Sequence, residues 1–247
     1  MAVLLRIFKV LWAGFWVCFA TLLIFIPIVA ASFMSHTGNL PFTISKIWAW
    51  IMLKITWVRL ESSGNDNIRK GRSYVIISNH QSHFDSLALV MKLGIQFRWI
   101  IKKDLRKIPL FGFALYRSRN IFIDRSDRHK AVESISEGMK RLPSGASVMF
   151  FAEGTRSSDG EIQAFKKGGF ATALESGLPI LPVTVNGSRK VLPKGSLAFN
   201  PGVIEVVIGK PISTKPYSHD NLEDIMGKTR EIIVSNFNPY YPEKDRS

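Results

Sequence analysis

The chain has 247 residues, enough to bury one sizeable core, and this length favours one or two domains. Its 33 Lys and Arg against 19 Asp and Glu give a net charge of +14, which predicts attraction to an anionic partner such as lipid, nucleic acid or acidic protein. The single cysteine, Cys18, excludes an intrachain disulfide and lies in an apolar run, so the globular part has no thiol nucleophile.

The first predicted element is a long apolar helix. Residues 10–34 contain no charge, and 25 residues at the helical rise span about 37 Å, more than the bilayer core of about 30 Å. Arg6 and Lys9 precede this run, as in a signal peptide, but the apolar part of a signal peptide has only about 7 to 15 residues. We therefore expect a retained membrane anchor, kinked or interrupted near Pro27.

A second helix is predicted over Pro41–Leu60. Lys46, Trp50, Lys54 and Trp57 recur at spacings of four, four and three, which places cations and indoles on one face. The opposite face is apolar, so the pattern is typical of a helix at a membrane interface.

The charges around this hairpin predict its orientation. The connection at residues 35–39 carries no Lys or Arg, whereas Lys54, Arg59, Arg69 and Lys70 end or follow the second helix, which places both ends on the cytoplasmic side. Three arrangements of the hairpin stay open: it crosses the bilayer, it dips into one leaflet, or its two helices are buried in a soluble core. We predict residues 1–60 as a two-helix membrane anchor and residues 61–247 as a cytosolic domain.

Short apolar runs alternate with helical patterns after a polar linker predicted at residues 61–67. This alternation predicts an α/β domain with a mostly parallel central sheet flanked by helices, whose loops at the carboxyl ends of the strands form the site. The predicted strands are Tyr74–Ser78, Arg98–Lys102, Asn120–Ile123, Ser147–Phe151, Ile180–Val185 and Val203–Ile208. The predicted helices lie near Asp85–Lys92, Pro109–Tyr116, Asp127–Arg141, Gly168–Glu175 and His219–Asn236.

The first polar segment that follows a predicted strand is residues 79–85, with the sequence NHQSHFD. On one helix His80 and Asp85 would diverge by about 140°, so they meet only if the chain bends between them. With that bend the Asp85 carboxylate accepts the Nδ1 proton of His80 and leaves Nε2 as a base. If the two residues do not meet, the alternative is that Asp85 caps a helix and His80 is simply solvated.

A second polar segment, residues 151–157, also follows a strand. Backbone N–H groups at Gly154, the hydroxyl of Thr155 and the guanidinium of Arg156 suit phosphate oxygens. The alternative is an ordinary polar turn with an exposed ion pair between Glu153 and Arg156.

Two further stretches complete the pattern. Residues 120–125 end a strand in an arginine, Arg125. In residues 178–183, Pro182 lies well inside a predicted strand, which indicates an edge, a bulge or a strand start.

Together these four stretches resemble the glycerolipid acyltransferase family, which includes the 1-acylglycerol-3-phosphate acyltransferases. Residues 79–85 match the block N-H-x-S-x-x-D, and residues 122–125 match F-I-D-R. Residues 152–156 match P-E-G-T-R except that Ala152 replaces the proline, and Arg119 stands where a glycine is common. Residues 101–105 and 108–112 are also similar to the family.

The resemblance implies a reaction. His80 would be the general base oriented by Asp85, taking the proton of the sn-2 hydroxyl of lysophosphatidic acid, which attacks an acyl thioester carried by acyl carrier protein or coenzyme A. Glycerol 3-phosphate or another lysophospholipid is an alternative acceptor. No cofactor, metal or covalent acyl-enzyme is implied. The residues assigned to substrate binding are Lys102, Arg125, Glu153, Gly154, Thr155 and Arg156.

We expect a monomer at the inner (cytoplasmic) membrane, with the catalytic domain on the cytosolic side and no nucleic acid partner. Two other classes of protein remain as alternatives. One is a metal-dependent hydrolase with His80, His83 and Asp85 as ligands. The other is an inert, membrane-tethered binder of anionic lipid or nucleic acid.

Overall fold

A computed structural model of the chain describes residues 2–124 and 126–242. Seven strands form one sheet in the order β1-β7-β6-β2-β5-β3-β4, and every neighbouring pair is parallel except β6 with β7. The mostly parallel sheet predicted from the sequence is confirmed. The strands are β1 (Val58–Ser63), β2 (Val75–Ser78), β3 (Phe97–Lys102), β4 (Ile121–Ile123), β5 (Ser147–Phe151), β6 (Ile180–Asn186) and β7 (Gly202–Ile208).

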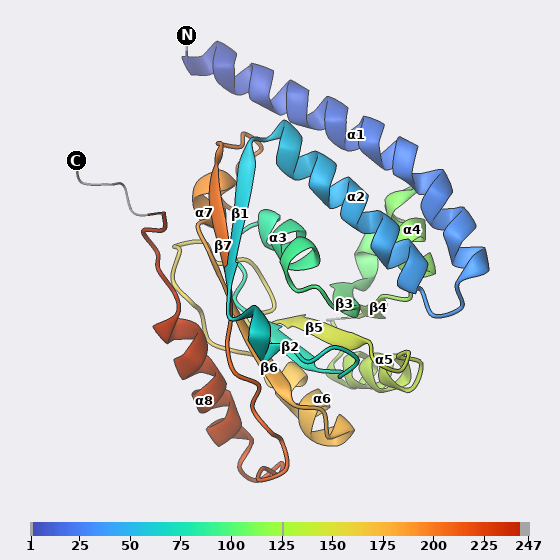
Figure 1. Ribbon diagram of the computed structural model, residues 1–247, viewed down its shortest axis with the longest axis vertical. Coiled ribbons are helices and arrows are strands. Elements are labelled where there is room, and N and C mark those ends of the chain that lie inside the picture. Colours follow the sequence, from blue (N-terminus) through green and yellow to red (C-terminus); the bar gives the residue numbers. More distant parts are fainter. Residues whose placement is uncertain (1, 125, 243–247) are drawn as a thin grey trace.

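Helices cover both faces of the sheet (Figure 1). The helices α1 to α4 lie on one side, and α5, α6 and α8 lie on the other. The helices are α1 (Ala2–Met34), α2 (Asn39–Ile55), α3 (Phe84–Lys92), α4 (Phe111–Arg117), α5 (Arg128–Lys140), α6 (Gly168–Ser176), α7 (Ser188–Val191) and α8 (Leu222–Ser235), with short 3₁₀ turns η1 (Asn65–Asn67) and η2 (Lys103–Lys107).

The alternation of side chains along the strands divides the core in two. In β2, Ile76 packs into the cluster beneath α2 and α3, whereas Val75 and Ile77 pack into the cluster beneath α6 and α8. Both faces are therefore apolar, as expected for a parallel strand between two helical layers.

The structure corrects the sequence prediction around residue 60. The helix predicted over Pro41–Leu60 is wrong at its end, because α2 stops at Ile55 and β1 begins at Val58. The linker predicted at residues 61–67 is also wrong, since Glu61, Ser62 and Ser63 pair with β7 at the edge of the sheet. The predicted boundary between residues 60 and 61 thus falls within a strand.

The bulge predicted as one possibility at Pro182 is present, although β6 itself lies between β7 and β2 and all seven of its residues are buried. Two residues of β6, Leu181 and Pro182, stand opposite three residues, 209–211, of the partner segment. The β7 ladder ends at Ile208, and pairing resumes only at the isolated bridge between Ile180 and Ile212. Pro182, which has no N–H to donate, stands beside this interruption and accepts from the N–H of Gly209.

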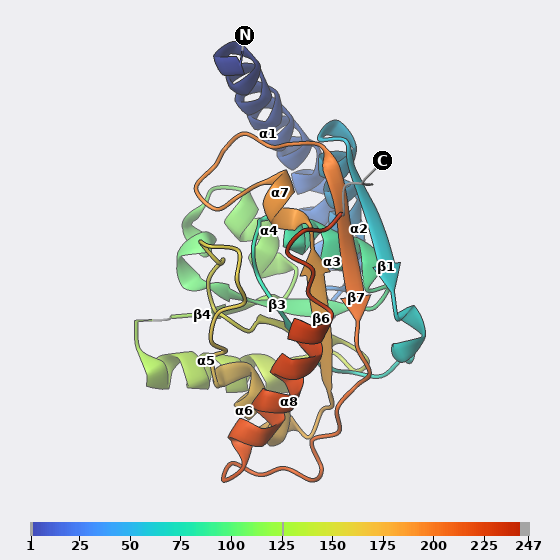
Figure 2. The ribbon, with the colours of Figure 1, turned by 90° about the vertical axis from the view of Figure 1, so that its left-hand side faces the viewer.

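The two N-terminal helices form the predicted hairpin. Among the described residues, α1 is the one helix long and apolar enough to cross a membrane, and it continues through Pro27, where a kink or interruption was predicted. Its N-terminal turns project beyond the α/β domain (Figure 2). Gly38 makes the turn into α2 with φ 74, a left-handed conformation that glycine adopts without strain. By contrast, α2 buries Phe42 and Leu53 in the core.

Candidate active site

Two loops meet where neighbouring strands end. β2 and β5 are parallel and adjacent, with Ser78 in register with Phe151, so the segments that follow them leave the sheet side by side. The N–H of Ser157 donates to the carbonyl of His80 at 2.8 Å, which joins the two loops directly.

Asn79 makes the bend that the sequence argument required. Its side-chain amide donates to the carbonyl of Val185 at 3.0 Å and accepts from the N–H of the same residue at 2.8 Å. This pair of bonds imitates one further rung of the ladder with β6, so the main chain turns away at His80 without leaving a backbone group of β6 unpaired.

His80 and Asp85 meet as predicted. His80 Nδ1 lies 2.8 Å from Asp85 Oδ2, and the same oxygen accepts the N–H groups of Gln81 at 2.7 Å and Ser82 at 2.9 Å. Asp85 is completely buried in the first turn of α3, whereas the His80 side chain is 15% exposed. Three donors on one oxygen hold the carboxylate in place, so the imidazole presents Nε2 outward.

An aromatic wall supports the imidazole. The ring of Phe151 lies flat against His80, with centroids 3.6 Å apart and planes 10° apart, and Trp99 stacks behind Phe151 at 5.6 Å. Sequence reasoning missed this contact. The period-two pattern of β5 was the available signal, because it places Phe151 on the same side of the sheet as Met149, opposite Phe150.

Glu153 binds the backbone of the His80 loop. It is 2% exposed, its Oε1 accepts the N–H of His80 at 2.7 Å, and its Oε2 accepts the N–H of Gln163 at 3.0 Å. Burial raises the pKa of this carboxyl, against the opposing effect of the two backbone hydrogen bonds. Both oxygens of Glu153 therefore bind backbone groups, one in each of the two segments that they join.

The proposed anion site lies beside this loop. Gly154 turns the chain with φ 71, Thr155 is exposed and Arg156 is half-buried. Lys194, which sequence reasoning did not single out, reaches across to donate to the carbonyl of Arg156 at 2.7 Å. Partial burial and then the nearby Arg156 guanidinium lower the pKa of His83, the residue before α3.

The family model described as Acyltransferase matches residues 59–186, more than half of the chain. The chain belongs to the acyltransferase family. A chloroplast 1-acyl-sn-glycerol-3-phosphate acyltransferase of Arabidopsis thaliana is 37% identical over 171 residues, which are 68% of this chain and 48% of that protein. The 1-acyl-sn-glycerol-3-phosphate acyltransferase of Pseudomonas aeruginosa is 36% identical over 161 residues, 65% of this chain and 62% of its own.

The fold is also similar to a solved member of the family. The crystal structure of the 1-acyl-sn-glycerophosphate acyltransferase from Thermotoga maritima superposes with a TM-score of 0.82 at 25% identity and covers 95% of each chain. The expected family and fold class are confirmed. The chain spans about half the length of the plant relatives that it matches.

Two of the residues assigned from the family resemblance, Lys102 and Arg125, belong to neither of these two loops. Arg125 is outside the described residues, which resume after it at Ser126. Lys102 ends β3, is exposed and pairs with Asp104 at 2.7 Å. Within the described part of the chain, no group of three or more His, Cys, Asp and Glu side chains is placed to bind a metal ion.

Proposed function

We propose that this acyltransferase transfers a fatty acyl group from an acyl thioester to the sn-2 hydroxyl of 1-acylglycerol 3-phosphate, which gives phosphatidic acid. The observation that carries the proposal is the 2.8 Å contact between His80 Nδ1 and Asp85 Oδ2, in a chain whose relatives are named for this activity. Glycerol 3-phosphate and other lysophospholipids are the alternative acceptors.

His80 acts as the general base in this reaction. Its Nε2 takes the proton of the acceptor hydroxyl as the oxygen attacks the thioester carbonyl, and Asp85 stabilises the resulting imidazolium through Nδ1. Collapse of the tetrahedral intermediate breaks the C–S bond, and the proton leaves with the thiol. No covalent acyl-enzyme is needed, because the hydroxyl and the thioester react directly.

The residues of the second loop position the acceptor. Thr155 and Arg156, with the backbone of Gly154, bind the acceptor phosphate and so place its hydroxyl near His80. Arg125 and Lys102 are proposed to add positive charge at the same site. Glu153 contributes by fixing the His80 loop, because its two oxygens bind backbone N–H groups.

The location of the enzyme follows from the same assignment. The acceptor chain lies in a bilayer, and α1 would retain the enzyme there as a monomer at the inner (cytoplasmic) membrane, with the α/β domain on the cytosolic side. Acyl carrier protein and coenzyme A are both anionic, so a net charge of +14 would steer either donor to the site.

The test is an acyl-transfer assay on the detergent-solubilised enzyme with a panel of acceptors and both thioester carriers. His80→Ala should lose at least about a hundredfold in kcat while retaining lysophosphatidic acid binding, because general-base catalysis contributes about 10²–10⁴-fold. The control is His83→Ala, which removes the neighbouring imidazole of the same loop. Transfer by His80→Ala at the wild-type rate would refute the assignment.

Two further arms separate the alternatives. Arg156→Gln should raise KM for lysophosphatidic acid more than for a phosphate-free acceptor, and equal use of both acceptors by the wild type would contradict a phosphate site. Activity that disappears with a chelator and returns with zinc would favour the metal-dependent hydrolase.

A further inference from the structure

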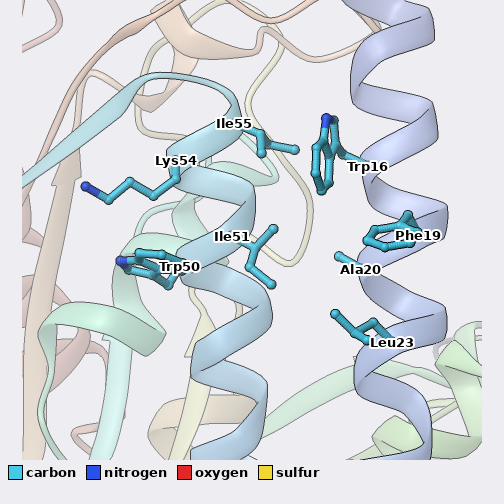
Figure 3. Close-up of a pocket in the computed structure, with 8 residues that line it drawn as sticks. All are labelled: Trp16, Phe19, Ala20, Leu23, Trp50, Ile51, Lys54 and Ile55. Carbon is cyan, nitrogen blue, oxygen red and sulfur yellow. The ribbon is translucent and has the colours of Figure 1, made fainter.

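The two N-terminal helices leave an apolar groove between them (Figure 3). The groove has a volume of about 240 Å³, and seven of its eight lining residues are apolar. Four come from α1 and four from α2: Trp16, Phe19, Ala20 and Leu23, then Trp50, Ile51, Lys54 and Ile55.

The walls of the groove remain open to the surroundings. Phe19, Leu23 and Trp50 are each about half exposed although they line a concave surface. A contiguous apolar surface of this kind marks a contact with a partner or a membrane. Because α1 is apolar and long enough for a bilayer, the occupant that best suits this groove is the hydrocarbon chain of a lipid.

The charge of the hairpin indicates which lipid suits it. The first acidic residue of the chain is Glu61, whereas both helices and their ends carry cations. Lys54 stands at the border of the groove with its Nζ 5.9 Å from the centroid of the Trp50 ring. No carboxylate pairs with Lys54 in the described part of the chain, so its ammonium is available to a phosphate. The cations up to residue 60 are Arg6, Lys9, Lys46, Lys54 and Arg59.

We propose that this groove is a binding site for an anionic phospholipid. One acyl chain lies between α1 and α2, its phosphate pairs with Lys54, and Trp50 lies at the level of the head group. The groove volume is below the roughly 300–1,000 Å³ of pockets that enclose a whole ligand. The site therefore takes part of one chain, and the rest of the lipid stays in the bilayer.

The first arm of the test compares two lysines of α2. The full chain in detergent is titrated with phosphatidylglycerol and with phosphatidylcholine of the same acyl chains, and bound lipid is counted by native mass spectrometry. Wild type should prefer phosphatidylglycerol, and Lys54→Gln should weaken that preference about fivefold. Lys46→Gln is the matched control, because Lys46 lies over the Phe42 ring at 5.7 Å on the same helix but outside the groove.

The second arm compares two phenylalanines of α1. Phe19→Ala removes part of the wall and should reduce retention of both lipids, whereas Phe15→Ala, one turn earlier and outside the lining, should not. Equal effects of the two lysine variants, or equal retention of both lipids by wild type, would overturn the proposal. A dimer that retains no lipid would mean that a second copy covers the groove.

The proposal is independent of acyl transfer. His80→Ala should bind phosphatidylglycerol as wild type does, since His80 lies outside the groove lining. If the wild type prefers phosphatidylglycerol but transfers no acyl group, the proposed function fails and the lipid site stands. If the wild type transfers acyl groups but shows no lipid preference, the lipid site fails and the proposed function stands.

Discussion

At the scale of single residues, the site consists of an imidazole fixed on three sides. Asp85 binds Nδ1, Glu153 binds the backbone N–H of His80, and Phe151 covers one ring face. Only the first of these contacts was predicted from the sequence, because a bend between His80 and Asp85 was needed for the pair to function at all. The other two depend on which strands are neighbours, and residue spacing does not contain that information.

Phe151→Leu tests the aromatic support. Loss of the stacked ring should lower kcat about tenfold with little change in KM, because a misplaced base costs rate while acceptor binding persists. Phe151→Tyr keeps the ring and should restore the rate. The control is Phe150→Leu, whose side chain lies in the opposite core cluster: it should cost under about 1.5 kcal/mol of unfolding free energy and leave kcat unchanged.

Glu153 makes stability depend on pH in a defined direction. Burial raises the pKa of its carboxyl above the ordinary value of 4.5, so the folded chain binds this proton more tightly than the unfolded chain does. Its contribution to stability is therefore complete below pH 4.5 and is lost as pH rises through the folded-state pKa. In urea unfolding, wild-type stability relative to Glu153→Gln should decline upward from about pH 4.5. A relative stability that increases over that range would contradict the argument.

At the scale of elements, Arg98 ties the hairpin to the sheet. It is 1% exposed in β3, and its guanidinium donates to the carbonyl of Thr37 at 2.7 Å and to Asn39 Oδ1 at 2.6 Å. Burial lowers the pKa of Arg98 to about 10, still far above neutrality, so the group stays charged and its hydrogen bonds are charge-assisted.

Arg98→Met should loosen this connection locally. The free energy lost with two charge-assisted hydrogen bonds is larger than the free energy gained by removing a buried charge. The free energy of local opening should therefore fall by about 2 kcal/mol. Amide hydrogen exchange at residues 35–39 should then accelerate at least about tenfold. Arg72→Met, at an exposed arginine, serves as the control, and unchanged exchange in Arg98→Met would refute the role.

The elements themselves were largely predictable. Six strands and five helices of the α/β domain follow from apolar runs and helical periodicity, and each lies within a few residues of its prediction. β1 was missed because its second half, Glu61 to Ser63, is polar and so resembles a linker in composition. These residues can be polar because β1 is an edge strand, one side of which meets solvent. The end of α2 was missed because Trp57 and Val58 continue the helical apolar pattern, while Trp57 takes a positive φ of 53.

At the scale of the molecule, the hairpin is a part of the fold as well as the proposed anchor. α2 supplies Phe42, Met52 and Leu53 to the core, and burial of such side chains contributes about 1.5–3 kcal/mol each. Their sum is comparable with the net stability of about 5–15 kcal/mol of a whole domain.

Two truncations test this integration. A chain that lacks residues 2–56 should fail to melt cooperatively, because the core beneath α2 is exposed. A chain that lacks only residues 2–9 should keep a cooperative transition by circular dichroism, because Val3, Leu4, Leu5, Ile7 and Phe8 are exposed. Cooperative melting of the isolated residues 61–247 would instead support an independent domain with a boundary at residue 60.

Only Thr56 and Trp57 separate α2 from the edge strand β1, and Trp57 stacks on Trp12 of α1 at 6.3 Å. With only two residues between them, the α/β domain cannot swivel on the hairpin, so on the proposed membrane anchoring its height and tilt over the lipid surface are fixed together. An enzyme held in the proposed way would collect a lipid acceptor by lateral diffusion in two dimensions. Its rate would then follow the mole fraction of acceptor in the surface, and inert lipid or detergent would slow it by surface dilution even at an unchanged bulk concentration.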